Sequence, residues 1–280
     1  MMQKCILTVG VVIATTGRKE IVTDTIHSLA RLRSVPGCLV VVGASLKDLP
    51  DITNHLPFSV HLLVATQIGA SIQRNQGIRK IDTSVRYVCF LDDDMELHRD
   101  YFTEIEKVFD SDSRIAGFSG MVLANGNINR IHAREKLDAH EIYPEMPSFG
   151  FYPNKWPGFY GCNMNIRRDL LQVEVFDEKL PFNSLGEDCE MGFRLSHHGF
   201  VGGSARCPAV HLATKSGRIS EVGLGYSQII NYLYFTQKDI GFPKIKTYWE
   251  SLVKKPIINL VFVIFPCLGL KSSIDRRGRF

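Results

Sequence analysis

Residues 87–94 read YVCFLDDD, a run of apolar side chains that leads directly into three aspartates. Such a run is typical of a strand buried on both faces, as in a parallel sheet covered by helices. Three adjacent carboxylates repel one another, so packing them together costs free energy unless a positive group lies beside them. A hard cation such as Mg²⁺ or Mn²⁺ would meet that need and bridge to phosphate oxygens. By contrast, an acidic helix cap needs only one aspartate. Taken alone, the cluster also fits an aspartyl phosphotransferase or a Mg²⁺ phosphatase.

Strand and helix patterns alternate around this stretch. We expect strands over residues 6–14, 38–42, 58–64, 87–91 and 115–123, and helices over residues 18–33, 69–80, 100–109, 186–198 and 220–238. This alternation predicts an α/β fold with a mostly parallel sheet flanked by helices, and in such sheets ligands bind beyond the carboxyl ends of the strands. Residues 125–157 lack a periodic pattern and are too long for an ordinary connection, which suggests a functional loop or lid.

The composition narrows the class of protein. The 280 residues are 45% hydrophobic and 22% charged, a globular balance, and the net charge of +4 is too weak to imply a nucleic-acid partner. The seven cysteines include no C-x-x-C pair, which argues against structural zinc and favours buried reduced thiols in a cytosolic protein. The apolar run that follows Lys4 has some features of a secretion signal. It is β-branched and lacks a clear cleavage site, so a first core strand is the better interpretation.

A second acidic cluster, GEDCE at residues 186–190, opens one of the expected helices. One of its carboxylates could serve as a general base, because like-charged neighbours and partial burial raise a carboxyl pKa into a useful range. Helix capping, with an ion pair from Glu190 to Arg194, explains the same residues equally well.

Two basic or titratable segments have open interpretations. His211 follows the apolar residues 208–210, and a lone histidine at a strand end is more often structural than a metal ligand. It becomes a ligand candidate only if the fold brings it to Asp92–Asp94. In the loop TKSGR at residues 214–218, Lys215 and Arg218 could close over phosphates or lie in a solvated turn.

Taken in order, these segments resemble the family 2 glycosyltransferases of the GT-A fold over roughly residues 5–240. VVIATTGR at residues 11–18 looks like the family's first strand and nucleotide-binding turn, and QRNQGI at residues 73–78 looks like its RN-G element. Residues 90–94 look like its D-x-D metal motif. GCNMNIRR at residues 161–168 is similar to its acceptor-side segment, and GED at residues 186–188 to its ED element. A downstream histidine, here His211, often joins the metal shell in such enzymes.

The resemblance implies an inverting glycosyltransferase that uses Mn²⁺ or Mg²⁺ and a nucleotide diphosphate sugar. Asp92 would hold the donor ribose or sugar, Asp94 with His211 would bind the metal, and Asp188 would be the general base. The other donor-binding positions would be Thr15, Arg18, Arg74, Asp93, Lys215 and Arg218, and the acceptor-side positions Asn163 and Glu187.

One position departs from the family pattern. Family members commonly carry an acidic residue just after the second strand, where it binds the nucleotide base, but residues 42–45 read VGAS. Asp48 or Asp51 could substitute for it. The choice among UDP-, dTDP- and GDP-linked donors therefore stays open.

The chain divides into a GT-A domain and a tail. We expect residues 1–240 to form the domain, with a nucleotide-binding half at about 1–124 and an acceptor half at about 125–240, followed by a helical tail at 241–280. Residues 257–270 are 14 nearly all apolar positions between basic flanks, short of the ~20 that span a bilayer. This suits a peripheral anchor at the inner face of a bacterial cell membrane, with a glycan or lipid-linked acceptor in cell-surface polysaccharide assembly. The alternative is a helix that covers the core.

Two other functions compete with an active glycosyltransferase of the hexosyltransferase type. A nucleotidyltransferase or other sugar-phosphate enzyme could use the same acidic metal cluster, but it would release pyrophosphate rather than a nucleoside diphosphate. A non-catalytic nucleotide-sugar-binding protein could share the fold, since a fold does not fix a function.

Overall fold

The computed structural model of the chain describes residues 5–6, 8–52, 55–143, 149–150, 158–214, 216, 220–238, 240–241, 249–254 and 256–257. Within them, eight strands form one sheet in the order β5-β4-β2-β6-β9-β8-β10-β7. In chain order these are β2 (Val9–Thr15), β4 (Cys38–Gly43), β5 (Ser59–Val64), β6 (Tyr87–Leu91), β7 (Met95–Leu97), β8 (Ile115–Asn125), β9 (Asn163–Arg167) and β10 (Phe200–His211). The short strands β1 (Cys5–Ile6) and β3 (Ser34–Val35) pair separately in parallel.

Strand directions place three strand ends at one edge of the sheet. Strands β5, β4, β2 and β6 run parallel to one another, and β9 is inserted antiparallel between β6 and β8. Because β10 is parallel to β8, it also runs in the direction of β6. The carboxyl ends of β2, β6 and β10 therefore meet at the same edge, and β7 returns antiparallel beside the end of β10.

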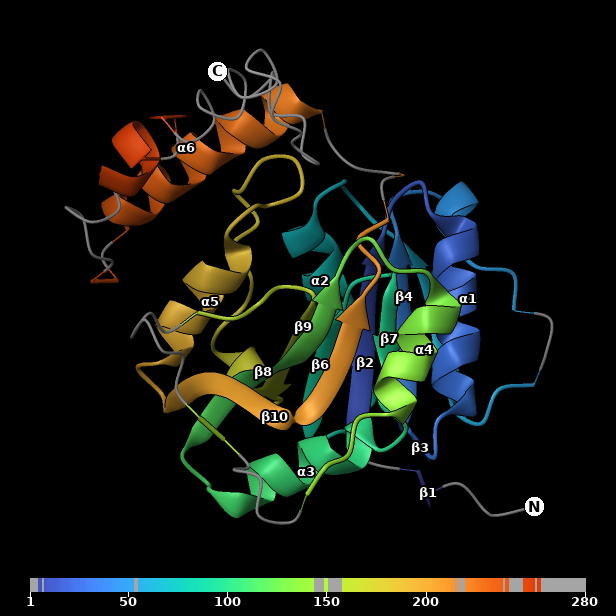
Figure 1. The fold of residues 1–280 in the computed structure, drawn as a ribbon. Coiled ribbons are helices and arrows are strands. Elements are labelled where there is room, and N and C mark those ends of the chain that lie inside the picture. Colours follow the sequence, from blue (N-terminus) through green and yellow to red (C-terminus); the bar gives the residue numbers. More distant parts are fainter. Residues whose placement is uncertain are drawn as a thin grey trace, which may run out of the picture.

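Helices cover both faces of the sheet (Figure 1). Helices α1 (Lys19–Arg31) and α3 (Tyr101–Ser111) pack on one face, whereas α2 (Ala70–Lys80) and α5 (Glu187–Leu195) pack on the other. The side chains of β2 alternate between the two cores, so that Val11 and Ile13 face α1 and Val12 faces α2. This two-sided burial explains why β4 and β6 are apolar throughout.

A glycine sets the distance between α2 and the sheet. A Cβ atom on Gly77 would lie 2.3 Å from Cγ1 of Val12, so only glycine fits at this contact. The close approach fixes the position of α2 over β2, with its N-terminal turns at the strand ends. Arg74, one turn before Gly77, is thereby held at the edge where the strands end.

Two further helices lie outside these layers. Helix α4 (Arg130–Asp138) lies beside α1 and β7, and α6 (Glu221–Gln237) lies beyond α5, away from the sheet (Figure 1). Three short helical turns complete the described chain: η1 (Leu46–Asp48), η2 (Leu170–Gln172) and the π-helical η3 (Glu250–Lys254).

Most expected elements are confirmed, and the exceptions have physical reasons. The mostly parallel α/β sheet is present, and the strand expected over 6–14 is divided between β1 and β2. Residues 125–157 were wrongly expected to be irregular throughout, because they contain α4, a helix rich in charged residues. Strand β9 was not expected, because its sequence NMNIR reads as polar. The five cysteines whose state is described are free thiols.

The expected membrane-surface tail falls almost wholly outside the described residues, which within 257–270 include only Ile257. Among the helices that the structure describes, none combines the length and apolar character needed to cross a bilayer.

Candidate functional site

A cleft of about 760 Å³ opens at the edge where β2, β6 and β10 end. Its walls include acidic, basic and apolar side chains from both halves of the sequence. Ten of the lining residues carry the argument below: Thr15, Arg18, Arg74, Asp92, Asp93, Glu187, Asp188, His211, Phe182 and Leu224. Its volume suits a ligand the size of a nucleotide sugar.

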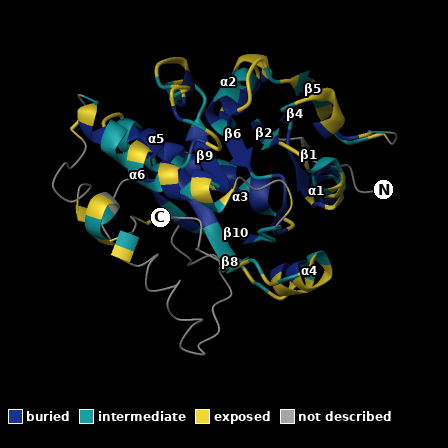
Figure 2. Ribbon diagram, turned by 90° about the horizontal axis from the view of Figure 1, so that it is seen from above, coloured by how far each residue is buried: buried dark blue, intermediate teal, exposed yellow. Residues whose placement is uncertain are grey.

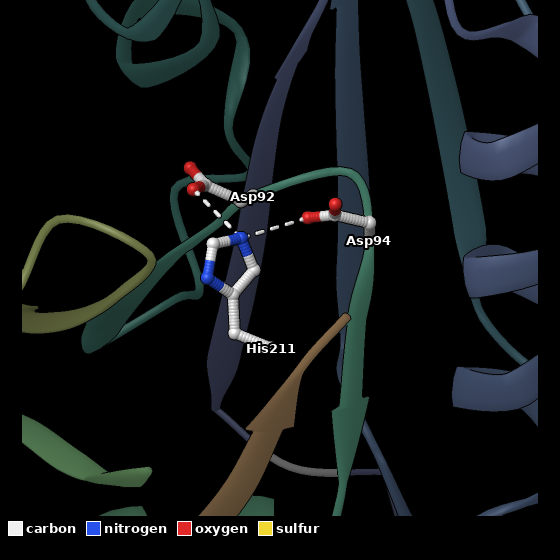
Figure 3. A group of neighbouring side chains, drawn as sticks. All are labelled: Asp92, Asp94 and His211. Atoms are coloured by element: carbon white, nitrogen blue, oxygen red, sulfur yellow. Dashed lines mark ion pairs between the residues drawn. The ribbon is translucent and has the colours of Figure 1, made fainter. Parts of the chain in front are cut away.

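Two aspartates and a histidine converge on one point of this cleft. Nε2 of His211 lies 3.0 Å from Oδ1 of Asp94 and 3.7 Å from Oδ2 of Asp92. Figure 3 shows the imidazole between the two carboxylates, with His211 at the end of β10 and the aspartates in the turn between β6 and β7. One ligand atom from each of the three residues lies within 4.8 Å of the others. The fold thus brings His211 to the aspartate cluster, the condition under which it becomes a ligand candidate.

The donor set fits a divalent cation. Oδ1 of Asp94 is buried, and among the described residues no group hydrogen-bonds to it in good geometry. Oδ1 of Asn125, which can only accept, lies 2.9 Å from Nδ1 of His211, so Nδ1 carries a proton. Nε2, facing the carboxylates, is the nitrogen left to coordinate a metal. A ligand set of two carboxylate oxygens and one imidazole nitrogen suits Mn²⁺. The two carboxylates also suit Mg²⁺.

Asp93 and Asp94 have different electrostatic environments. Burial raises the pKa of Asp93 to about 6, although Arg18 and Thr15 act in the opposite direction. Burial would also raise the pKa of Asp94, but the adjacent His211, the Thr214 amide and Arg18 together lower it to about 2. Asp94 is therefore an anion at neutral pH, as a metal ligand must be.

The carboxylate of Asp93 joins three segments of the chain. Its carboxylate accepts hydrogen bonds from Oγ1 of Thr15 at 2.6 Å and from Nη1 of Arg18 at 2.7 Å. The other guanidinium nitrogens of Arg18 donate to the carbonyls of Thr214 and Ser216. Thr15 and Arg18, both expected to bind the donor, thus connect the end of β2 to the loop that follows β10.

Arg74 connects the two acidic clusters. Its guanidinium is 5% exposed and forms an ion pair with the buried carboxylate of Glu187. Its other terminal nitrogen lies 3.4 Å from Oδ1 of Asp92 and 3.3 Å from the carbonyl of Gly161. Burial raises the pKa of Glu187 to about 7, with Arg74 acting in the opposite direction. Arg74 therefore lies between the metal-ligand candidate Asp92 and the first turn of α5.

Asp188 lies in the same turn of α5 and borders the cleft. Its Oδ2 accepts a hydrogen bond from the amide of Gly161 at 2.9 Å, and its Oδ1 accepts one from the amide of Cys189 at 2.8 Å. Burial raises the pKa of Asp188 above its usual value, while these amides act in the opposite direction. The carboxylate is fixed in orientation and has a raised proton affinity, as a general base requires.

The remaining candidates have different placements. Asn163 is fully buried at the start of β9 and does not line the cleft, so its acceptor role stays a prediction. Lys215 and Arg218 lie outside the described residues. Sequence motifs did not indicate the lining residues Tyr160, Phe182 and Leu224. Tyr160 immediately precedes the GCNM segment, which was its only sequence signal.

The two acidic substitutes considered for base recognition are both engaged elsewhere. Asp48 accepts hydrogen bonds from the Gly17 amide at 2.6 Å and from Ser45, and so fixes the turn after β2. Asp51 forms an exposed ion pair with Lys19. Neither lines the cleft.

Comparisons with solved structures find the same fold. A mannosyltransferase from Pyrobaculum calidifontis, solved with GDP-Man and Mn²⁺, aligns with a TM-score of 0.58 and 13% identity over 96% of this chain and 77% of that chain. Residues 1–349 of S. aureus TarS, in complex with UDP-GlcNAc, align with a TM-score of 0.55 and 13% identity over 97% of this chain and 78% of that chain. A longer S. aureus TarS structure aligns with a TM-score of 0.53 and 12% identity over 91% of this chain and 44% of that chain. The present chain therefore spans less than half the length of that protein.

Sequence comparison supplies the family. No curated protein matches the chain. The model of the family described as glycosyl transferase family 2 matches residues 10–173, more than half of the chain, and this range includes the strand-end aspartates, Arg74 and Gly161. With the GT-A arrangement of sheet and helices, this match leads to one conclusion: the chain belongs to glycosyl transferase family 2.

Proposed function

We propose that the protein is an inverting, metal-dependent glycosyltransferase that moves a sugar from a nucleoside diphosphate donor to the hydroxyl of a glycan or lipid-linked acceptor. One observation carries the proposal. Asp92 and His211 of the aspartate–histidine cluster line the same cleft as the candidate base Asp188, and Arg74 lies between Asp92 and the first turn of α5. A metal site alone would fit many phosphate enzymes, whereas a metal site facing a positioned carboxylate supports transfer to a hydroxyl.

The residues that would hold the cation are Asp92, Asp94 and His211. When bound, Mn²⁺ or Mg²⁺ supplies a positive charge that stabilises the diphosphate as it leaves. The protein's own contribution is orientation, because Asn125 fixes the imidazole ring and the Thr214 amide holds the second oxygen of Asp94 at 2.7 Å. The complexes of the Pyrobaculum mannosyltransferase with Mn²⁺ and of TarS with UDP-GlcNAc support a metal and a nucleotide sugar here.

Asp188 would take the proton of the acceptor hydroxyl. A single in-line displacement inverts the anomeric carbon, and it needs a base on the side opposite the leaving group. The placement of Asp188 on α5, in the lining of the cleft that Asp92 and His211 also line, supports this assignment. Thr15, Arg18, Arg74 and Asp93 would contact the donor. Lys215 and Arg218 would close over its phosphates.

The acceptor is proposed from sequence alone. The basic and apolar composition of residues 241–280 supports a glycan acceptor near the inner face of a cell membrane, as in polysaccharide assembly.

The test measures which product leaves the donor. The full chain is incubated with UDP-, dTDP- and GDP-sugars and Mn²⁺, and nucleoside diphosphate and pyrophosphate are assayed in parallel. We expect one donor class to release nucleoside diphosphate. We also expect Asp188→Asn to slow release at least about 100-fold while donor binding persists, since a general base contributes 10²–10⁴. Asp138→Asn, an exposed change on α4, is the matched control. Pyrophosphate release would instead identify a nucleotidyltransferase, and normal rates for Asp188→Asn would remove it as the base.

A further inference from the structure

One buried row of residues on helix α6 faces the rest of the protein. Gly223, Ser227, Asn231 and Phe235 recur at every fourth position and are all fully buried. The side chain of Asn231 donates a hydrogen bond to the carbonyl of Leu185 at 2.9 Å. Because residues four apart share one helix face, this row fixes the rotation of the helix.

The adjacent row faces outward and is apolar. Val222, Tyr226 and Ile230 also recur at every fourth position, with exposed fractions of 63%, 52% and 39%. Figure 2 shows exposed positions recurring along α6. We name these three residues the α6 apolar row. Single exposed apolar residues are ordinary in soluble proteins, but a row of them along one helix face needs an occupant.

The α6 apolar row reaches the edge of the cleft at Tyr226. The ring of Tyr226 packs edge-on against Phe182, with 6.1 Å between ring centroids. Phe182 itself lines the cleft together with Leu224 of α6, and so does Asp188. Ile68, 70% exposed, adds another apolar side chain to the cleft wall. An apolar path therefore leads from the neighbourhood of the candidate base out onto α6.

We propose that the α6 apolar row is the seat for the hydrocarbon chain of an amphiphilic acceptor whose hydroxyl lies at Asp188. The inference rests on the proposed function and specifies its acceptor class. Continuity selects this occupant, because Phe182 lines the cleft beside Asp188 and also packs on Tyr226, so an acceptor held at Asp188 can extend over these two rings onto the row. A sugar without a lipid would gain nothing from an aliphatic row that extends beyond the cleft.

The experiment uses n-alkyl glucosides of increasing chain length, kept below their micellar concentrations. Their binding to the full-length protein is measured by calorimetry, which needs no turnover. We expect dodecyl glucoside to bind more tightly than hexyl glucoside. In Tyr226→Ser and Ile230→Ser, neither of which lines the cleft, this preference should shrink by about tenfold, since each buried methylene contributes severalfold in affinity. The control is Ile131→Ser, an isoleucine on α4 that is 72% exposed and lies outside the α6 apolar row, which should keep the preference.

The outcomes separate the proposal from its rivals. Equal affinity for short and long chains in the wild-type protein overturns it, and so does a preference that survives both serine variants. Dimerisation that either variant abolishes would assign the row to a second copy of the chain. Loss of binding to anionic vesicles with an unchanged chain-length preference would assign it to a bilayer, and either result overturns the proposal. If no donor releases nucleoside diphosphate, the proposed function fails, whereas the calorimetric result still tests the seat.

Discussion

Arg74 forms a buried ion pair with Glu187, a residue 113 positions later in the chain, and reaches Asp92 with its other terminal nitrogen. The pair joins α2 to α5, the helix that carries Asp188. A buried arginine with two acidic partners is costly to disturb, because removal of one charge leaves the others desolvated and unpaired.

Replacement of this arginine should destabilise the fold. We expect Arg74→Met to lower the free energy of unfolding at pH 7.5 by about 3 kcal/mol, the usual cost of breaking a buried ion pair. Urea unfolding followed by fluorescence measures the effect. Arg79→Met is the control on the same helix, since Arg79 is 63% exposed and 4.0 Å from Glu178, and it should change stability little. Equal effects of the two substitutions would mean that the buried pair contributes no more than a surface contact.

The pH dependence of stability should report on Glu187. Burial raises its pKa to about 7 in the folded protein, so the folded state retains a proton that the unfolded state has released. The stability linked to this group is therefore complete below its unfolded pKa and is lost as the pH rises through about 7. Glu187→Gln cannot lose that proton, so its stability relative to wild type should increase between pH 5 and pH 8. A change of the opposite sign would mean that the attraction of Arg74 outweighs burial.

Removal of the histidine should weaken metal binding. We expect His211→Ala to lower the affinity for Mn²⁺ at least about tenfold, since loss of even an outer partner of a metal ligand has that effect. Electron paramagnetic resonance of free Mn²⁺ measures the affinity directly. His132→Ala, at an exposed position on α4, serves as the control. Unchanged affinity in His211→Ala would exclude this residue from the metal shell.

Helix α4 should stabilise the turn that carries Asp92–Asp94, through its ion pairs with Glu96. Glu96, two residues after Asp94 and 1% exposed, forms ion pairs with Arg130 and Arg134 of α4 and accepts a hydrogen bond from Ser28 at 2.6 Å. We expect Arg134→Met to lower the free energy of unfolding by about 2 kcal/mol, because a buried carboxylate loses part of its compensation. Lys136→Met on the same helix should have little effect in the same urea titration. If both variants unfold alike, the ion pair of Arg134 contributes no more to stability than an exposed lysine.

Local patterns predicted the parts of the fold that depend on local burial. Strand β6 matches its expected limits because its residues are apolar on both faces. Strand β9 escaped detection because Asn163 and Asn165 are fully buried inside the sheet, where a sequence pattern would place apolar residues. Helix α4 escaped because its stability comes from ion pairs with Glu96 and a cap by Asn129, not from a broad apolar face.

The site was predictable in its acidic parts and not in its assembly. The sequence pattern alone indicates the strand-end aspartates as a site, since three carboxylates after a buried strand require a counter-charge. The contact between His211 and Asp94 depends on β10 lying beside β7, and no local pattern encodes that pairing. The apolar lining residues Phe182 and Leu224 carry no motif, so only the fold reveals that they border the cleft.

The insertion of β9 between β6 and β8 also has a consequence for biosynthesis. As the chain leaves the ribosome, β6 has a partner on one side only, and β8 has none until residues 163–167 follow it. Open strand edges of this kind readily pair with other nascent chains. The interval between synthesis of β8 and of β9 is therefore the stage at which the growing polypeptide most depends on chaperones. Slow codons placed just before residue 163 should reduce the yield of native protein.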